Sequence, residues 1–389
     1  MNSRFSGMGA QFYLWWSRLA AMTIKELLQL GRDGFLMFAI AFLFTVDIYM
    51  TRNVRLELNH ATVVVHDADH SEASRELIHR FRPPYFKLGG EILDARHGIR
   101  LLDQGQALMV LDIPSNFQQD LLRGKPTDVQ VMVDTSNTVL GSLAASYTAQ
   151  IIGQYSFEAA LERMGATEES LGNVPMIEDR HRVWYNPNQN DQWFIPISEL
   201  LTVITILAIM LPAAAAVREK ERGTIEQLLV SPLTPVQILL PKVIAMTLVI
   251  LMGTAVSLFL VLDLVFRIPI KGSLPLFFAV TALYTIATSG LGLYIATMSR
   301  NLAQAAMLAI LILMPMIFLS GAWTPPEAMP AGLRQAMYLS PLYYFIEMGY
   351  GILLKGAGLD VLRDSLLGLT LLGTTIFGLG VWRFKRQFG

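Results

Sequence analysis

The chain contains six long runs of mostly apolar residues, and these runs constrain its fold more than any other feature. A helix that crosses the hydrocarbon core of a bilayer needs about 20 such residues. The predicted spans are residues 34–50, 195–217, 236–262, 274–298, 302–321 and 365–382. Hydrophobic residues make up 53% of the chain and charged residues only 16%, a composition that favours a membrane protein over a soluble globular protein. We therefore predict an α-helical polytopic membrane protein with six transmembrane helices.

Lys and Arg are distributed unevenly between the two sides of these spans. Six spans put both termini on the same side, and with the termini inside, the inner segments hold twelve Lys and Arg residues against five in the short outer connections. Because basic residues favour the cytoplasmic side, both termini are predicted to be cytoplasmic. Residues 1–33 precede the first span, and 11–31 mix Trp and Leu with charged side chains, which predicts an amphipathic helix at the bilayer surface.

Residues 52–194, between the first two spans, are predicted to form an α/β domain outside the membrane. Strand patterns occupy 61–69, 107–114 and 128–136, and helix patterns occupy 71–81, 115–124 and 139–164. Ser71 and Ser115 are the expected N-caps of the first two helices, and Gly124 is the expected end of the second.

The outer connection at residues 322–364 is long and largely apolar, and four prolines interrupt it. Irregular backbone is tolerated at membrane depth only where protein or a cavity surrounds it. This composition predicts re-entrant or interfacial helices rather than a solvated loop.

Several kinds of chemistry are excluded. The chain has no cysteine, so it forms no disulfide, thiol nucleophile or thiolate metal site. The nearest approach to a phosphate-binding loop is Gly124 and Lys125, which are followed by Pro126 instead of Ser or Thr. We therefore expect no ATP hydrolysis by this chain itself. A net charge of −1 gives no sign of nucleic-acid binding.

All histidines fall within the predicted outer domain: His60, His66, His70, His79, His97 and His181. The motif HDADH at residues 66–70 permits a metal site. Asp67 and Asp69 are equally well explained as turn formers between a strand and a helix N-cap, and the structural interpretation is favoured. No metal site is predicted.

Three acidic residues, Asp47, Glu199 and Asp263, lie near the predicted outer ends of spans. Because a carboxylate is costly to bury in lipid, such residues invite a functional interpretation, but solvation at the interface is favoured here. No Ser/His/Asp group or carboxylate pair lies within one segment, so no catalytic residue is predicted.

The densest charge cluster lies at residues 218–222, directly after the second span. Ile225, Leu228 and Leu229 follow it as the apolar stripe of a short amphipathic helix. One interpretation is a loop whose charges only orient the spans. Orientation depends on Lys and Arg and hardly on acidic residues, so the three interleaved glutamates favour a docking surface with complementary charges.

The run REKERGTIEQLLVSPLTPVQILLPK resembles the cytosolic coupling segment of ABC-2 type permeases, the membrane subunits of bacterial ABC exporters. The blocks LSGAWTPPEAMP and LSPLYYFIEMGYGILLKGAG resemble the family's pattern after its fifth span, and the similarity covers nearly the whole chain. It is nearest to the subgroup with a large periplasmic domain, which occurs beside ATPase subunits and periplasmic adaptor proteins. Two positions depart from the pattern: Pro241 replaces the usual Gly before Lys242, and Tyr350 replaces a frequent basic residue.

The resemblance implies a bacterial inner-membrane protein with residues 52–194 in the periplasm and a coupling segment at 218–235. Two permeases would form a homodimer or heterodimer, and separate ATPase chains would bind ATP and Mg. The implied coupling residues are Arg218, Glu219, Glu221, Arg222, Gly223, Thr224, Glu226 and Leu228, with Lys25 and Glu26 of the first helix against the same partner.

The implied activity is outward transport of an amphiphilic or hydrophobic substrate, drug-like or lipid-like, between the two permeases along spans one, two and five. One alternative is a membrane-anchored envelope or secretion protein that moves no cargo. Another is an ABC permease that extracts lipid or glycan, or transmits force to a periplasmic adaptor.

Overall fold

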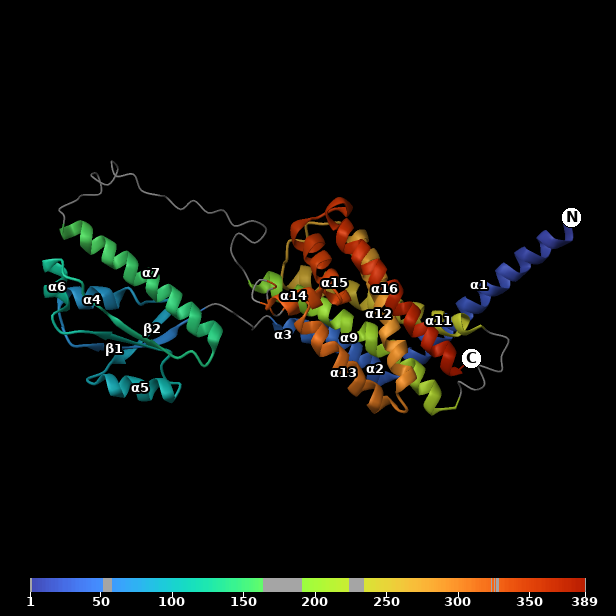
Figure 1. Cartoon of the computed structure of the whole chain (residues 1–389), viewed down its shortest axis with the longest axis horizontal. Helices are drawn as coiled ribbons and strands as arrows, with labels where there is room; N and C mark the ends of the chain where they lie inside the picture. The colour runs from blue at the N-terminus through green and yellow to red at the C-terminus, as the bar shows by residue number, and fades with distance from the viewer. Residues whose placement is uncertain are drawn as a thin grey trace. The chain divides into compact units, whose positions relative to one another are not determined.

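The computed structural model describes residues 2–51, 58–163, 191–223, 234–322, 324, 326 and 329–388. The chain divides into two compact units, one of Met1–Val54 with Arg182–Gly389 and one of Arg55–His181. Figure 1 labels their helices and strands. In its described part the first unit is helical, whereas the second combines a sheet with helices.

Within the residues that the structure describes, the helical unit consists of α-helices of very different length and three π-helical segments, η1, η3 and η5. In chain order they are α1 (Asn2–Gly31), α2 (Gly34–Phe42), η1 (Leu43–Asp47), α3 (Ile48–Met50), α9 (Asp191–Glu221), α11 (Pro235–Val256), η3 (Ser257–Val265), α12 (Leu274–Met298), α13 (Leu302–Phe318), α14 (Ala331–Met337), α15 (Pro341–Tyr350), η5 (Gly351–Lys355) and α16 (Leu359–Phe388).

Within the described residues, four helices are long and apolar enough to cross a membrane: Trp193–Glu221, Val236–Val265, Leu274–Met298 and Leu359–Gln387. The helices Tyr13–Gly31 and Gly34–Met50 meet at 84°. If this bent pair is counted as one span, the number of candidate spans is five. Helix α13 is apolar but has 17 residues. The prediction of a polytopic helical membrane protein is therefore confirmed, and the number six stays a prediction.

Helix α12 packs along both α9 and α16 at the centre of this unit. Its glycines allow the close approach, because a Cβ at Gly292 would overlap the carbonyl oxygen of Ile209 and one at Gly290 would lie 2.5 Å from the Cα of Phe377. Tyr284 of α12 stacks on Phe345 of α15 with ring centroids 4.0 Å apart. The outer connection thus includes a short helix, α15, whose apolar side chains belong to the core.

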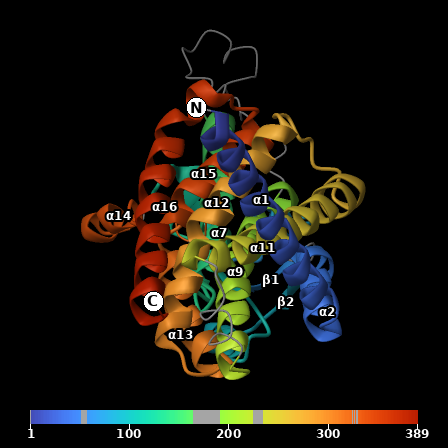
Figure 2. The ribbon, with the colours of Figure 1, turned by 90° about the vertical axis from the view of Figure 1, so that its right-hand side faces the viewer.

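Helix α1 has two different apolar faces. Leu19 and Leu30 are buried. Helix α1 crosses α11, as Figure 2 shows. Leu14, Ile24 and Leu28 lie on another face and are at least half exposed. The predicted amphipathic helix at 11–31 is therefore present, and it begins earlier in the chain than expected.

The second unit holds a sheet in the order β2-β1-β3-β4, with β1 parallel to β2 and β3 and antiparallel pairing of β3 with β4. Its elements are β1 (Ala61–Asp67), α4 (Glu72–His79), β2 (Phe86–Glu91), α5 (Ala95–Asp103), β3 (Met109–Ile113), α6 (Phe117–Arg123), β4 (Gln130–Val133) and α7 (Thr138–Arg163). Alternate side chains of a strand face opposite sides of a sheet. Helices α4, α6 and α7 cover one face of the sheet and α5 covers the other (Figure 1). Accordingly Val63 and Leu111 pack toward α4, α6 and α7, while Val64 and Val110 pack toward α5.

The structure corrects two details of the predicted α/β domain. Strand β2 and helix α5 were not predicted, and β2 carries Gly89 and Gly90, which disfavour strand assignment from sequence. Ser115 does not cap α6: the N-cap is Asn116 at φ 71°, and the Asp69 carboxylate accepts from the backbone N–H of Gln118 instead. The Ser71 cap of α4 and the end of α6 at Gly124 are confirmed.

Candidate functional site

The predicted charge cluster forms the last turn of α9 rather than a separate loop. Helix α9 continues through Glu221, because Arg, Glu and Lys are all good helix formers. It ends at Glu221, and Gly223 shortly after it has a φ of 66°, in the left-handed region that glycine adopts readily. The charges are therefore held in a fixed helical frame.

One of these charges, Glu219, belongs to a buried ion cluster that joins three helices. The Lys242 Nζ of α11 lies 2.8 Å from Glu26 Oε1 of α1 and 2.7 Å from Glu219 Oε1 of α9. The Lys25 Nζ contacts the same two oxygens at 3.1 and 3.0 Å. Lys242 is only 1% exposed, whereas the Lys25 side chain is 44% exposed.

The cluster has two positive and two negative groups, so its formal charge is zero. Unpaired buried charges are strongly unfavourable, and removal of one partner from a buried pair costs about 3–5 kcal/mol. The four side chains therefore fix the positions of α1, α9 and α11 relative to one another.

Three further charged residues of the 218–222 run, Arg218, Lys220 and Glu221, connect α9 to the ends of other helices. Arg218 Nη1 lies 2.6 Å from Asp33 Oδ2 at the junction of α1 and α2. Lys220 donates to the backbone oxygen of Ser299 at 2.8 Å, after the end of α12. Glu221 accepts from the backbone N–H of Leu302 at 2.8 Å, where a carboxylate also interacts favourably with the N-terminus of α13.

Asp33 is the N-cap residue of α2. Its carboxylate accepts from the backbone N–H of Leu36 at 3.1 Å, as an N-cap does. This hydrogen bond and the Arg218 guanidinium lower the pKa of Asp33 below its usual value. The carboxylate is therefore ionised at neutral pH and holds Arg218 in place.

The structure separates the predicted coupling residues into two groups. Glu26 and Glu219 are buried and paired within the chain, whereas Lys25, Glu221 and Arg222 are exposed. Thr224, Glu226 and Leu228 lie outside the described residues. Their contact with a partner chain stays a prediction, and the exposed side chains are the ones available to it in this conformation.

Lys242 is the site residue that sequence reasoning missed. It was noted only as the neighbour of Pro241, although a lysine in the second turn of an apolar helix is itself a signal, because a buried cation needs a partner. Helix α11 starts at a capping box of Thr234 and Gln237 and continues through Pro241. Pro241 therefore lies inside this helix and not at its start.

The remaining candidate residues have local roles. The carboxyl groups of Asp47 and Glu199 interact with each other across η1 and α9, a pairing that the sequence did not reveal. Asp67 accepts from the backbone N–H groups of Asp69 and His70, as a turn former does. Among the described residues no three His, Asp or Glu side chains are grouped as metal ligands.

Comparison with known proteins places this architecture in a family. Residues 34–382 match the family described as ABC-2 family transporter protein. The chain is 34% identical over 368 residues to the Inner membrane transport permease YhhJ of Escherichia coli (strain K12), covering 94% of this chain and 96% of that protein.

Two further relatives in the same organism carry a transport description. The Probable multidrug ABC transporter permease YbhR is 31% identical over 337 residues, with coverage of 85% of this chain and 88% of the relative. The Probable multidrug ABC transporter permease YbhS is 29% identical over 382 residues, with coverage of 96% and 98%. With a family match over most of its length and relatives of equal extent, the chain belongs to the ABC-2 transporter family.

Proposed function

We propose that this chain is the membrane-spanning permease subunit of an ATP-driven exporter in the bacterial inner membrane, powered by separate ATPase chains. It works with a second permease and moves an amphiphilic or hydrophobic substrate outward. The names of the relatives, which include probable multidrug ABC transporter permeases, support the substrate class. The proposed topology has both termini in the cytoplasm and residues 52–194 in the periplasm, where an adaptor protein is a possible partner.

The observation that carries this proposal is the fixed geometry at the end of α9. Arg222 and Glu221 are exposed there, while Glu219 and Arg218 of the same turn are bonded to α1, α11 and the start of α2. A force applied to the exposed side chains is therefore transmitted to three helices through short ionic contacts. Such a connection suits a surface that an ATPase pushes or rotates.

The absence of cysteine provides the test, because a single introduced thiol is the only one in the chain. Thr224→Cys, at the position that follows Gly223 in the sequence, is crosslinked in native membranes and the captured protein is identified. Asp364→Cys is the matched control, since Asp364 is exposed at the start of α16 and lies on the outer side in the proposed topology. Capture of a P-loop ATPase at position 224 alone, with a yield that changes with nucleotide, is the expected result.

A thiol at position 224 that reacts with cytoplasmic reagents but captures no ATPase would refute the coupling role. It would favour the membrane-anchored interaction protein instead. Capture at position 364 as well would contradict the proposed topology.

A further inference from the structure

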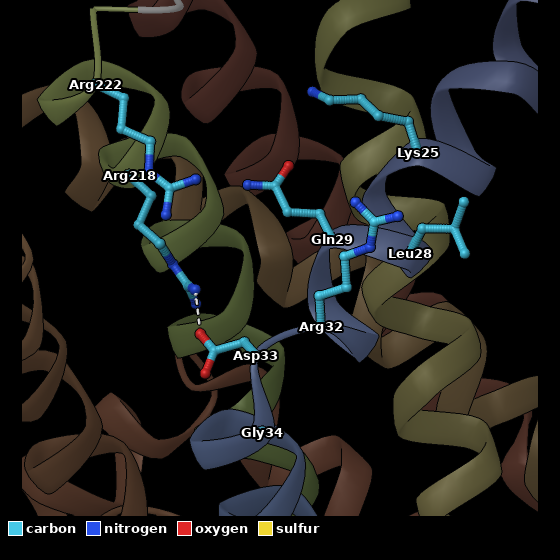
Figure 3. A pocket seen from close by; sticks show the side chains of 8 residues that line it. All are labelled: Lys25, Leu28, Gln29, Arg32, Asp33, Gly34, Arg218 and Arg222. Carbon is cyan, nitrogen blue, oxygen red and sulfur yellow. Dashed lines mark hydrogen bonds and ion pairs between the residues drawn. The ribbon is translucent and has the colours of Figure 1, made fainter.

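A basic cavity lies beside the ion cluster, between α1 and α9. Its volume is about 750 Å³, and its lining includes four cations, Lys25, Arg32, Arg218 and Arg222, against one carboxylate, Asp33. Figure 3 shows the side chains of α1 on one side of this cavity and those of α9 on the other. The cavity therefore presents an excess of positive charge.

Two of the four cations are already neutralised within the chain. Lys25 is paired with Glu26 and Glu219, and Arg218 is paired with Asp33. Arg32 and Arg222 are exposed, and neither forms an ion pair with any residue that the structure describes. Two guanidinium groups on opposite walls thus remain available for an anion, and guanidinium groups bind phosphate oxygens in a bidentate manner.

An apolar cavity adjoins the basic one. It has a volume of about 640 Å³, shares Asp33, Arg218 and Arg222 with the basic cavity, and extends between α2, α9 and α13. Leu36 and Met210 are among its apolar lining residues. A ligand that spans both cavities must carry an anionic group at one end and a hydrocarbon chain at the other.

The position of the cavities matches the level of lipid headgroups. Helices α1 and α2 meet at 84°, so α1 lies nearly in the membrane plane if α2 crosses it. The exposed apolar face of α1 includes Leu28, which also lines the basic cavity. Apolar side chains on an in-plane helix penetrate to the boundary between headgroups and acyl chains. The basic cavity is therefore at that boundary.

We infer that the two cavities form one binding site for an anionic phospholipid, with its phosphate between Arg32 and Arg222 and an acyl chain along the apolar cavity. Basic pockets between membrane helices on the cytoplasmic side are suited to such headgroups. A second copy of this chain would cover the apolar cavity equally well, but it would give no reason for two unpaired guanidinium groups at the mouth. This inference requires a membrane location and depends neither on the direction of transport nor on an ATPase.

The test measures lipid binding to the purified full-length chain by native mass spectrometry in detergent. Phosphatidylglycerol is compared with phosphatidylcholine of the same acyl chains and with glycerol 3-phosphate, which has the anionic group but no acyl chain. Phosphatidylglycerol is expected to bind at least tenfold more tightly than either. The variant R32Q/R222Q should lose about tenfold in affinity for each guanidinium removed, by the strength of charge-assisted hydrogen bonds.

Two further variants locate the site. Arg383→Gln is the matched control, because Arg383 is an exposed cation near the end of α16 and lies outside both cavities. It should bind phosphatidylglycerol as the unchanged chain does. Ala306→Phe places a ring in the apolar cavity and should weaken phosphatidylglycerol without changing the response to glycerol 3-phosphate.

Three results would overturn the inference: equal binding of the two lipids, unchanged binding by R32Q/R222Q, or binding of glycerol 3-phosphate as tight as that of the lipid. The last would assign a free-phosphate site. A dimer that persists at every lipid concentration while neither lipid binds would assign the apolar cavity to a second copy.

Discussion

At the scale of single residues, Lys242 is the most deeply buried charge of the ion cluster. It is nearly inaccessible and contacts both buried glutamates, whereas Lys25 contacts the same two carboxylates from a partly solvated position. We expect Lys242→Met to lower the free energy of unfolding by about 3–5 kcal/mol, because it leaves a buried negative charge. Lys25→Met should cost at most about 1 kcal/mol, since a partly exposed ion pair contributes little. Thermal unfolding of the purified chain measures both.

A second substitution separates charge from packing in this cluster. Glu219→Gln combined with Lys242→Met restores a formal charge of zero, with Lys25 and Glu26 remaining. The double variant should be less destabilised than the sum of the single variants predicts, because contacting residues are energetically coupled. Equal destabilisation by Lys242→Met and Lys25→Met would contradict the assignment of Lys242 as the central cation.

Asp69 predicts a pH dependence in the α/β unit. Burial acts to raise the pKa of this carboxyl, but hydrogen bonds from the Ser71 hydroxyl and from backbone N–H groups that include that of Gln118 lower it below its usual value. A lowered pKa means that the ionised form stabilises the folded unit above about pH 4, and that this contribution is lost as the pH falls through the lowered pKa. The protection factors of the α6 amides in the full-length chain, which compare each observed exchange rate with the intrinsic rate at the same pH, should therefore fall at acidic pH.

The variant Asp69→Asn tests this assignment. The amide oxygen still accepts a hydrogen bond but does not titrate in this range, so the variant should lose about 1 kcal/mol at neutral pH and show a flatter acid dependence. Asp103→Asn is the control, because Asp103 ends α5 on the opposite face of the sheet. If Asp103→Asn flattens the acid response of α6 as much as Asp69→Asn does, Asp69 is not its source.

At the scale of elements, the sequence predicted what depends on local patterns. The apolar spans, the surface helix and α7 were recognisable because each has a long run of one periodicity. Strand β2 was missed because its residues Phe86–Glu91 show little alternation and are mostly exposed. The N-cap of α6 was misassigned because the backbone N–H of Gln118 donates to the carboxylate of Asp69, which comes from a distant loop.

Packing between elements predicts opposite effects of two neighbouring glycines in α16. A Cβ at Gly380 would overlap the carbonyl oxygen of Gly290 in α12, whereas a Cβ at Gly378 has no atom within 4 Å. Gly380→Ala should destabilise the chain by about 1–3 kcal/mol, because the helices must move apart. Gly378→Ala should be neutral or stabilising by up to about 1 kcal/mol, because alanine favours the helix.

The two alanine variants differ by one methyl group at positions two residues apart, so each serves as the control for the other. Thermal unfolding in the same detergent distinguishes them. A similar loss of stability in both would mean that glycine is needed in α16 for a reason other than its contact with α12.

At the scale of the whole molecule, the sequence did not predict how the charges of the ion cluster meet. Lys25, Glu26 and Glu219 were predicted as coupling residues through family resemblance, and their mutual contacts depend on how α1, α9 and α11 pack. Residues far apart in the sequence are brought together only by that packing. The cavities next to them were unpredictable for the same reason.

The division into two compact units, each with its own core, predicts that they lose structure independently. Leu111 lies at the centre of the sheet and is fully buried, so Leu111→Ala should cost the α/β unit about 2–5 kcal/mol. Leu122→Ala is the control, because the Leu122 side chain in α6 is 67% exposed and its truncation should change little. Hydrogen exchange of the full-length chain reports both units in one experiment. We expect Leu111→Ala to accelerate exchange in β1 and β3 and to leave α9 and α12 unchanged, whereas equal acceleration in these helices would show that the chain unfolds as one cooperative unit.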